Sequence, residues 1–349
     1  MPPLRTKRPL KFYQTIPKID LHRHLEGSVR LSTLLDVRRT EGFTHLGTDY
    51  LRSLVQIVED EPYTFENFLS KFSTLRYFFQ SPEVINRITY EAIEDAALDN
   101  IKYLELIFTP VALSKAEKYP LDEVMDWVIE AAKEGERDNG VITRLTPSIN
   151  RHESLELAEK VIQFAVDRKD KGIVGLDLAG NEANFPATKF IGVFKEAQKA
   201  GLAIRIHAGE WGGASNVREA IEDFGATRIG HGVRILEDPS VVDIAKEHGT
   251  IFEVCITSNY QSGVVPQLKD HPLPVMLSKG LNTTLNTDDP SISQITLGYE
   301  YKLACEELGL SLSALVRQIL TSANAAFLPD ADRDKLVSEI DQLLSKYKG

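Results

Sequence analysis

Four of the eight histidines in this chain lie at or just before the end of a short apolar run. These are His22 and His24 in HRH, His207 in HAGE, and His231 in GHG. Residues two apart in a β-strand point to the same face, so His22 and His24 would share one face. The segment NTDDP adds two carboxylates, Asp288 and Asp289. Imidazole with carboxylate is a donor set that suits zinc.

A catalytic zinc site keeps one position open for water. We predict four zinc ligands: His22, His24, His207 and Asp288. Zinc lowers the pKa of water from about 15.7 toward 7 and so makes a nucleophile available. Glu210 could then donate a proton to the substrate while His231 orients or deprotonates the water, and Asp289 is left to bind substrate. Two other interpretations stay open: Glu210 as a carboxylate at a helix start, and His231 as a ligand of a second metal.

The remaining histidines and the cysteines show no such pattern. We predict structural or solvated roles for the four histidines in loop or helical sequence, which are His45, His152, His248 and His271. Cys255 and Cys305 lie in apolar or helical sequence and are predicted as buried thiols. No CxxC motif is present, so any zinc must be held by histidine and carboxylate.

Eight short apolar or β-branched runs give way in turn to helical sequence, an alternation that predicts a parallel sheet. The candidate strands are 18–24, 102–110, 142–149, 172–180, 203–209, 227–233, 250–258 and 282–289. Helical periodicity is clear at 154–168, where Ser154 is the expected N-cap residue, and at 215–224. Eight β/α units predict a (β/α)8 TIM barrel. No composition change marks a boundary, so we expect one domain over residues 1–349.

The longest interval between strands follows the first one and carries helical pattern over residues 28–100. Loops after the strands form the catalytic face of such barrels, so these extra helices are expected to form a lid over the site. Within 64–79, four apolar residues recur at helical spacing: Phe65, Phe68, Leu69 and Phe72. This stripe is either ordinary helix core or a lid face that touches a planar ligand, with Phe68 and Phe72 as the candidate contacts.

Composition excludes several classes of protein. The chain is 42% hydrophobic and 26% charged, which is ordinary for a globular protein, and its net charge of -11 with scattered basic residues argues against nucleic acid as a partner. The basic segment at residues 1–14 lacks the apolar stretch of a signal peptide, and no run reaches the roughly 18 apolar residues of a membrane span. We therefore expect a cytoplasmic protein without membrane contact.

As a set, the motifs resemble those of the adenosine and adenine deaminase family of the amidohydrolase superfamily. They are LHRHLEGS (21–28), GLDLAGNE (175–182), HAGE (207–210), GHG (230–232), TSN (257–259) and NTDDP (286–290). The resemblance implies a barrel with one zinc and hydrolytic removal of the exocyclic amine from an aminopurine. It assigns His22, His24, His207 and Asp288 to the metal, with Asp288 also among the catalytic groups.

The same resemblance assigns roles around the purine. It gives Glu210 the protonation of ring nitrogen N1 and His231 the attacking water. Asp289 would hold N7, and the backbone at Gly180 would hold N3. The chemical logic is consistent: protonation at N1 makes C6 electrophilic, hydroxide adds there, and ammonia leaves a 6-oxo purine.

Two departures from the family pattern concern the substrate. Where adenosine deaminases commonly have an aspartate that meets the ribose 5′-hydroxyl, this chain has Glu26, which is familiar from the adenine deaminases. Ile107 stands where many relatives have arginine. We expect a small purine nucleoside or base as the partner: adenosine or 2′-deoxyadenosine first, adenine second, and a modified adenosine such as aminodeoxyfutalosine or an N6-methyl nucleotide third.

Two other functions are weighed against this one. A binuclear amidohydrolase usually needs a carboxylated lysine on its fourth strand, and 172–180 contains no lysine. A non-catalytic binding protein on the same scaffold would have lost a ligand or the proton donor, and this chain retains all of the proposed residues.

Overall fold

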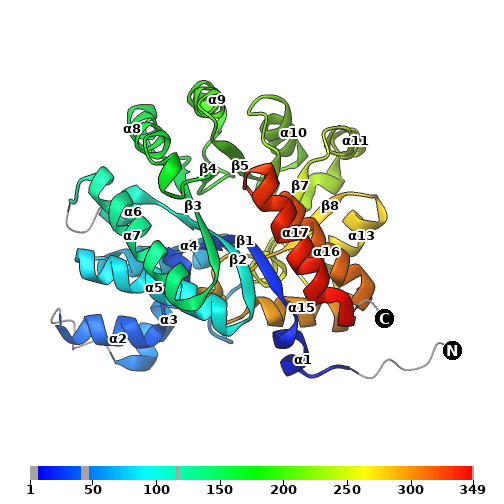
Figure 1. Cartoon of the computed structure of the whole chain (residues 1–349), viewed down its shortest axis with the longest axis horizontal. Coiled ribbons are helices and arrows are strands. Elements are labelled where there is room, and N and C mark those ends of the chain that lie inside the picture. The colour runs from blue at the N-terminus through cyan, green and yellow to red at the C-terminus, as the bar shows by residue number, and fades with distance from the viewer. Residues whose placement is uncertain (1–6, 41–46, 115–117, 348–349) are drawn as a thin grey trace.

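A computed structural model describes residues 7–40, 47–114 and 118–347, so His45 lies outside the described residues. Eight parallel strands pair in sequence order and form a nearly closed barrel surrounded by helices (Figure 1). The strands are β1 Lys18–His24, β2 Ile101–Phe108, β3 Ile142–Asn150, β4 Gly175–Ala179, β5 Ala203–Ala208, β6 Arg228–His231, β7 Ile251–Val254 and β8 Asn282–Leu285. The predicted (β/α)8 barrel is confirmed.

The last strand meets the first through the residues that follow β8. The backbone N–H of Asp288 donates to the carbonyl of His22 at 2.8 Å, and the N–H of His24 donates to the carbonyl of Asp288 at 2.8 Å. Closer to the middle of the barrel, the side-chain oxygen of Asn286 accepts a hydrogen bond from the backbone N–H of Leu21 at 3.0 Å. Closure of the barrel therefore brings Asp288 directly between the two histidines of β1.

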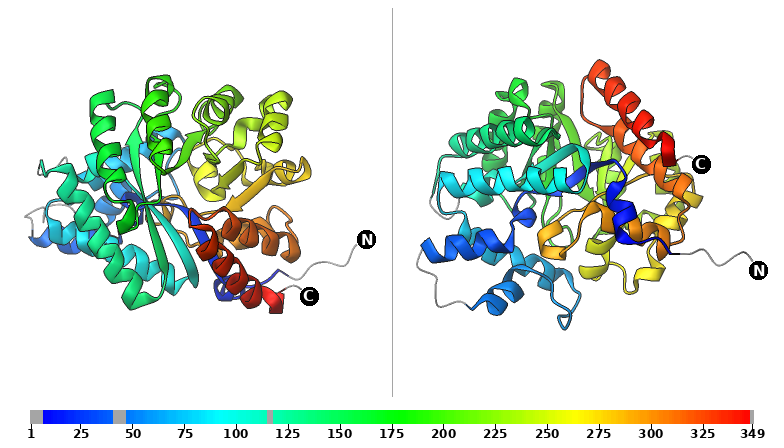
Figure 2. Two further views of the ribbon diagram at one scale, coloured as in Figure 1. Left: turned by 45° about the horizontal axis from the view of Figure 1, so that its top comes forward. Right: turned by 60° about the horizontal axis from the view of Figure 1, so that its bottom comes forward.

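Helices cover the outside of the barrel between successive strands (Figure 2). They are α5 Pro82–Leu98, α6 Pro110–Ser114, α7 Leu121–Asn139, α8 Leu155–Val166, α9 Ile191–Lys199, α10 Ala214–Glu222, α11 Pro239–Glu247, α12 Ile256–Gln261, α13 Leu273–Ser278, α14 Pro290–Ser293, α15 Leu297–Glu306 and α16 Leu312–Ala325. The side chain of Ser154 accepts a hydrogen bond from the N–H of Leu157, which makes it the N-cap of α8. Helix α1 Leu10–Thr15 precedes the barrel, and α17 Asp330–Leu344 packs on α16.

The extra helices lie between β1 and the barrel helix α5. They are α2 Leu31–Thr40, α3 Thr48–Val55 and α4 Phe65–Leu75, followed by the short turn η2 Arg76–Phe78. In Figure 1, α2, α3 and α4 are the blue helices to one side of the barrel. Helix α4 begins after Thr64, whose side chain accepts the N–H of Asn67. Its apolar face turns inward, since Phe68 is only 3% exposed.

Charged side chains, rather than apolar ones alone, fill the interior of the barrel. The guanidinium of Arg228 lies between Glu253, at 2.7 Å from Nε to Oε1, and Glu105. Arg205 lies between Asp177, at 3.2 Å, and Glu253, at 3.5 Å. Four of these five side chains are fully buried and Arg228 is 1% exposed, so each charge depends on its partners for solvation.

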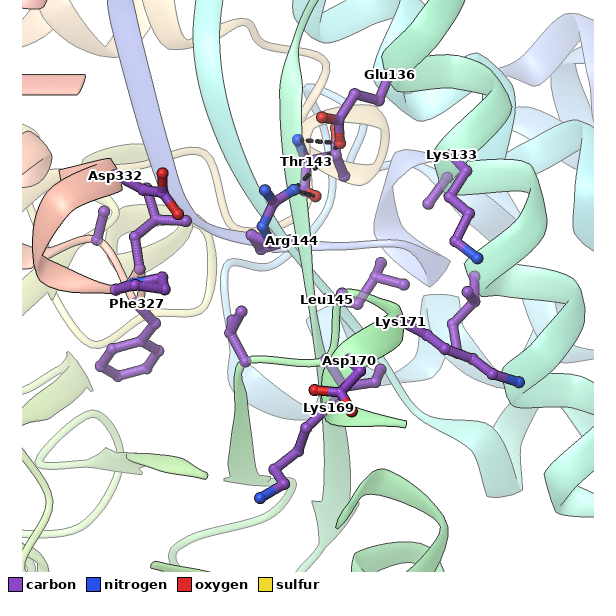
Figure 3. A pocket seen from close by; sticks show the side chains of 18 of the residues that line it. Lys133, Glu136, Thr143, Arg144, Leu145, Lys169, Asp170, Lys171, Phe327 and Asp332 are labelled. Atoms are coloured by element: carbon purple, nitrogen blue, oxygen red, sulfur yellow. Dashed lines mark hydrogen bonds and ion pairs between the residues drawn. The ribbon is translucent and has the colours of Figure 1, made fainter. Parts of the chain in front are cut away.

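The amino-terminal end of the barrel carries a surface cavity of about 930 Å³, opposite the end where the histidines lie. In Figure 3, the carboxylate of Glu136 in the rim of this cavity accepts from the N–H of Thr143 at 3.0 Å and from Arg144 at 3.2 Å. Cys255 and Cys305 are buried and are not joined in a disulfide, as predicted. Among the described residues, no helix is long and apolar enough to cross a membrane.

We expect Arg228→Leu to lower the free energy of unfolding by about 3–5 kcal/mol, because it leaves the carboxylate of Glu105 buried without a cation and leaves Glu253 with only the more distant Arg205. Urea unfolding followed by circular dichroism measures this change. The control is Arg137→Leu, which removes an exposed ion pair with Asp138 and should cost about 1 kcal/mol or less. Equal urea midpoints for the two variants would show that the interior ion pairs do not stabilise the barrel.

Candidate metal centre and active site

Three imidazoles and one carboxylate converge at the carboxyl end of the barrel. His22 and His24 extend from β1, His207 from β5, and Asp288 from the turn after β8, with one donor atom of each within 4.8 Å of the others. Nε2 of His24 lies 3.3 Å from Nε2 of His207. Oδ1 of Asp288 lies 3.2 Å from Nε2 of His22 and 3.3 Å from Nε2 of His24. The structure thus brings together the four predicted ligands.

These separations fit a zinc ion. Donor atoms about 2.0–2.1 Å from a tetrahedral metal lie roughly 3.3 Å from one another, which matches the three separations above. Nε2 of His22 is buried and makes no hydrogen bond. Burial, followed by repulsion from the other imidazoles, lowers the pKa of His24 to about 3 despite the nearby Asp288, so this ring is neutral at physiological pH. A neutral imidazole is the form that binds a metal.

Buried carboxylates orient two of these imidazoles from behind. Nδ1 of His22 lies 2.9 Å from Oε2 of Glu253, and Nδ1 of His207 lies 2.9 Å from Oδ1 of Asp177. Because each carboxylate accepts the proton of Nδ1, the lone pair of Nε2 is directed into the cluster. Sequence reasoning missed both carboxylates; the available signal was an acidic residue within an otherwise apolar strand, FEV in β7 and LDL in β4.

Burial and nearby negative charge favour the protonated form of two further carboxyl groups that face the cluster. Burial, followed by the negative charges of Asp288 and Glu182, raises the pKa of Glu210 well above its ordinary value. Burial and then the charge of Asp288 do the same for Asp289. Oδ1 of Asp289 is buried without a hydrogen bond, and a Cβ at Gly27 would lie only 1.8 Å from it, so the glycine permits this approach. Both groups can donate a proton or a hydrogen bond to a ligand.

The backbone is strained at two of the site residues. His231 and Asp288 both have φ of +61°, a left-handed conformation that non-glycine residues seldom adopt. His231 is 1% exposed, and its Nε2 lies 3.6 Å from Glu210 and 3.8 Å from Asp288. Burial, together with the neighbouring imidazoles, lowers the pKa of His231 well below its ordinary value although Asp288 opposes this shift. The ring is therefore neutral.

The loop that carries Glu210 is held by one buried carboxylate, that of Glu182 in the GNE sequence after β4. Its Oε2 accepts the backbone N–H groups of Glu210, Trp211 and Gly212 at 2.9–3.0 Å. Its Oε1 accepts the N–H of Gly209 at 2.7 Å and the side-chain amide of Asn216 at 2.9 Å. Sequence reasoning did not single out this residue.

A cavity of about 230 Å³ opens in front of the cluster. It brings together all four of the remaining predicted binding residues, which are Glu26, Phe68, Phe72 and Gly180. Phe68 is buried and also lines the cavity, so its position fits both interpretations of the aromatic stripe: packing in the helix core, and contact with a ligand. Arg76 of η2 and His152, just after β3, also line it, although neither was predicted as a site residue.

We expect Glu182→Gln to loosen the loop at residues 209–212. Whichever way a glutamine amide is turned, its NH2 group meets at least two N–H donors, and each unsatisfied donor costs about 1–3 kcal/mol. Trp211 reports the change: with Trp127 replaced by phenylalanine it is the only tryptophan. Its emission should shift to the red and acrylamide should quench it more strongly. Glu196→Gln, on the surface of α9, is the control. Identical quenching in the two variants would contradict the proposal that Glu182 holds the loop at residues 209–212.

Comparison with known proteins agrees with this geometry. The family model described as adenosine deaminase matches residues 17–343. A curated adenosine deaminase from Vibrio parahaemolyticus is 36% identical over 329 residues, which cover 94% of this chain and 98% of that protein.

Two solved structures share this fold over nearly the whole chain. Adenine deaminase from Arthrobacter aurescens superposes with a TM-score of 0.86 at 27% identity, over 94% of this chain and 99% of that one. The Arabidopsis protein ADAL in complex with IMP superposes with a TM-score of 0.85 at 27% identity, over 97% and 99% of the chains. From the family match, and from its identity to curated relatives over nearly its whole length, this chain belongs to the adenosine deaminase family.

Proposed function

We propose that this protein is a zinc-dependent aminohydrolase that converts adenosine or 2′-deoxyadenosine to inosine or 2′-deoxyinosine and releases ammonia. The observation that carries the proposal is that one cavity is lined by three of the four clustered donors, His24, His207 and Asp288, and by the carboxyl of Glu210, whose pKa is raised. Residues 1–349 would then form one catalytic domain, with α2–α4 as its lid. Its partner would be a small purine in the cytoplasm rather than a nucleic acid or a membrane.

One zinc ion per chain fits the donor set better than two. When bound, zinc supplies a Lewis acid that lowers the pKa of water toward neutrality. His22, His24, His207 and Asp288 would hold it. The described strand β4 offers no lysine to bridge a second metal ion, and its Asp177 is already engaged with His207 and Arg205.

The chain's own groups would then act on the purine. Glu210 donates its proton to N1, which makes C6 electrophilic. Asp289, protonated, donates a hydrogen bond to N7, and the backbone N–H of Gly180 donates one to N3. Water adds at C6 while His231 orients it or takes its proton, ammonia departs, and the product carries oxygen at C6.

The sugar would lie at the end of the cavity formed by the β1 loop and the lid. Oε1 of Glu26 accepts the backbone N–H of Thr109 at 2.7 Å, which fixes the carboxyl group. Arg76 lines the same cavity, and its Nε is buried without a hydrogen bond. Ile107 is fully buried, so its position presents no polar group here. We propose that Arg76 and Glu26 together recognise the ribose, with Phe68 and Phe72 against the purine.

Adenine is the second candidate substrate. Glu26 supports it, because glutamate at this place is typical of the adenine deaminases, and the Arthrobacter structure is one of these. A modified adenosine or a nucleotide is the third, since ADAL was solved with IMP. The free polar atom of Arg76 favours a substrate that extends beyond the purine ring.

Glu210→Gln should keep its zinc and lose turnover by a factor of about 10²–10⁴, because an amide cannot protonate N1. Loss of absorbance in the purine band measures the rate, and metal analysis measures zinc, which we expect at one ion per chain in both proteins. Near-normal turnover in the variant would exclude the assignment of Glu210. Two zinc ions per chain would favour a binuclear amidohydrolase instead.

Arg76→Met should lower kcat/KM for adenosine by about 10–100-fold, because a hydrogen bond to a charged group contributes about 1.5–3 kcal/mol. Activity on adenine should change little, since the base does not reach Arg76. The comparison uses adenosine, 5′-deoxyadenosine and adenine as substrates for the wild type and the variant. An equal loss on adenosine and adenine would show that Arg76 has no role in sugar recognition.

A further inference from the structure

A buried chain of polar side chains runs from the active site to the segment after β7. Nδ2 of Asn259, in α12, lies 3.1 Å from Nδ1 of His231. Oδ1 of the same amide lies 3.3 Å from Nε2 of His271. Asn259 is fully buried and His271 is 3% exposed, so these polar side chains exchange no hydrogen bonds with bulk water.

One backbone group fixes the direction of every hydrogen bond in this chain. The N–H of Leu273 lies 3.1 Å from Nδ1 of His271 and can only donate, so Nδ1 must accept. Burial lowers the pKa of His271 to about 3, so the ring carries a single proton. That proton must therefore be on Nε2.

The proton on Nε2 of His271 determines the orientation of the Asn259 amide. Nε2–H of His271 requires an acceptor, so the oxygen of Asn259 faces it and the NH2 group faces His231. With the amide turned over, an NH2 group would meet the Nε2–H of His271, and two donors would oppose each other in a buried site. Nδ1 of His231 thus accepts a hydrogen bond from the amide and carries no proton, so the proton of the ring is on Nε2.

We infer that His231 enters the reaction as an Nε2–H donor, and that Asn259 and His271 are positioning residues that hold it in this tautomer. The inference rests on the proposed function for its chemical meaning. Nε2 of His231 faces Glu210 at 3.6 Å and Asp288 at 3.8 Å, separations wide enough for an oxygen atom to lie against the N–H. Of its two possible roles, His231 therefore orients the water by donating to it and does not begin as the base.

Histidine tautomers can be read directly by nuclear magnetic resonance. In protein labelled with ¹⁵N-histidine, long-range ¹H–¹⁵N correlation distinguishes a protonated ring nitrogen from a bare one, and His231→Gln assigns the signal. We expect Nδ1 of His231 to be bare and Nε2 to be protonated, in the metal-free and the zinc-loaded protein. A protonated Nδ1 with a bare Nε2 would overturn the inference, whether or not the protein deaminates a purine.

Asn259→Asp reverses the direction of the hydrogen bond to His231, because a carboxylate can only accept from Nδ1 of that ring. The ring must then carry a proton on Nδ1, which makes it a base or an imidazolium. We expect kcat to fall by about 10²-fold or more at nearly constant KM, as for other active-site histidines held in the wrong tautomer. Unchanged or raised kcat would show that His231 acts as a base and would contradict the proposal.

A pair of variants at His271 separates positioning from packing. His271→Gln retains an N–H that can donate to Asn259, whereas His271→Phe fills the space without a donor. We expect the phenylalanine variant to lose about 10-fold or more in kcat and the glutamine variant to retain most of it, with equal circular dichroism and zinc content. Equal losses in the two variants would assign His271 a packing role only. Failure of the wild type to deaminate any purine would reject the proposed function and leave the tautomer result standing.

Discussion

The buried ion pairs in the barrel are the interaction on which the rest of the site depends. Asp177 and Glu253 hold the imidazoles of two candidate ligands, but a buried carboxylate alone would take up a proton and release its histidine. Although burial opposes it, Arg228 and Arg205 hold the pKa of Glu253 at about 2. The arginines in the barrel thus keep the carboxylates charged, and the charged carboxylates, through Nδ1, orient the Nε2 atoms of His22 and His207 toward the cluster.

The same contacts connect strands that do not pair with one another. Glu253 on β7 contacts His22 on β1, and Arg228 on β6 contacts Glu105 on β2 across the barrel. The backbone of Asp288 then closes the barrel against β1. Because the interactions that close the barrel also place the donor atoms, a change in the shape of the barrel would alter the separations between the candidate ligands.

The sequence predicted the barrel and the residues around the cluster because both follow from local patterns. Strand periodicity located the strand ends, and all of these ends meet on one face of the barrel. The supporting residues could not be predicted in the same way. Glu182 binds the backbone of Glu210, 28 residues away, and His271 contacts Asn259, 12 residues away. Arg76 shares a cavity with Glu26, about 50 residues away. Nothing in the local sequence of these three residues indicates such partners.

The protons of the site explain how an acidic cavity can receive a purine. Burial and nearby negative charge raise the pKa of Glu210 and of Asp289 and so favour their protonated forms. His231, with Nδ1 held by Asn259, directs its N–H into the same space. The cavity therefore presents hydrogen-bond donors where a count of acidic residues would predict acceptors. A purine offers ring nitrogens as acceptors, and water offers its oxygen, so this arrangement of donors matches both reactants at once.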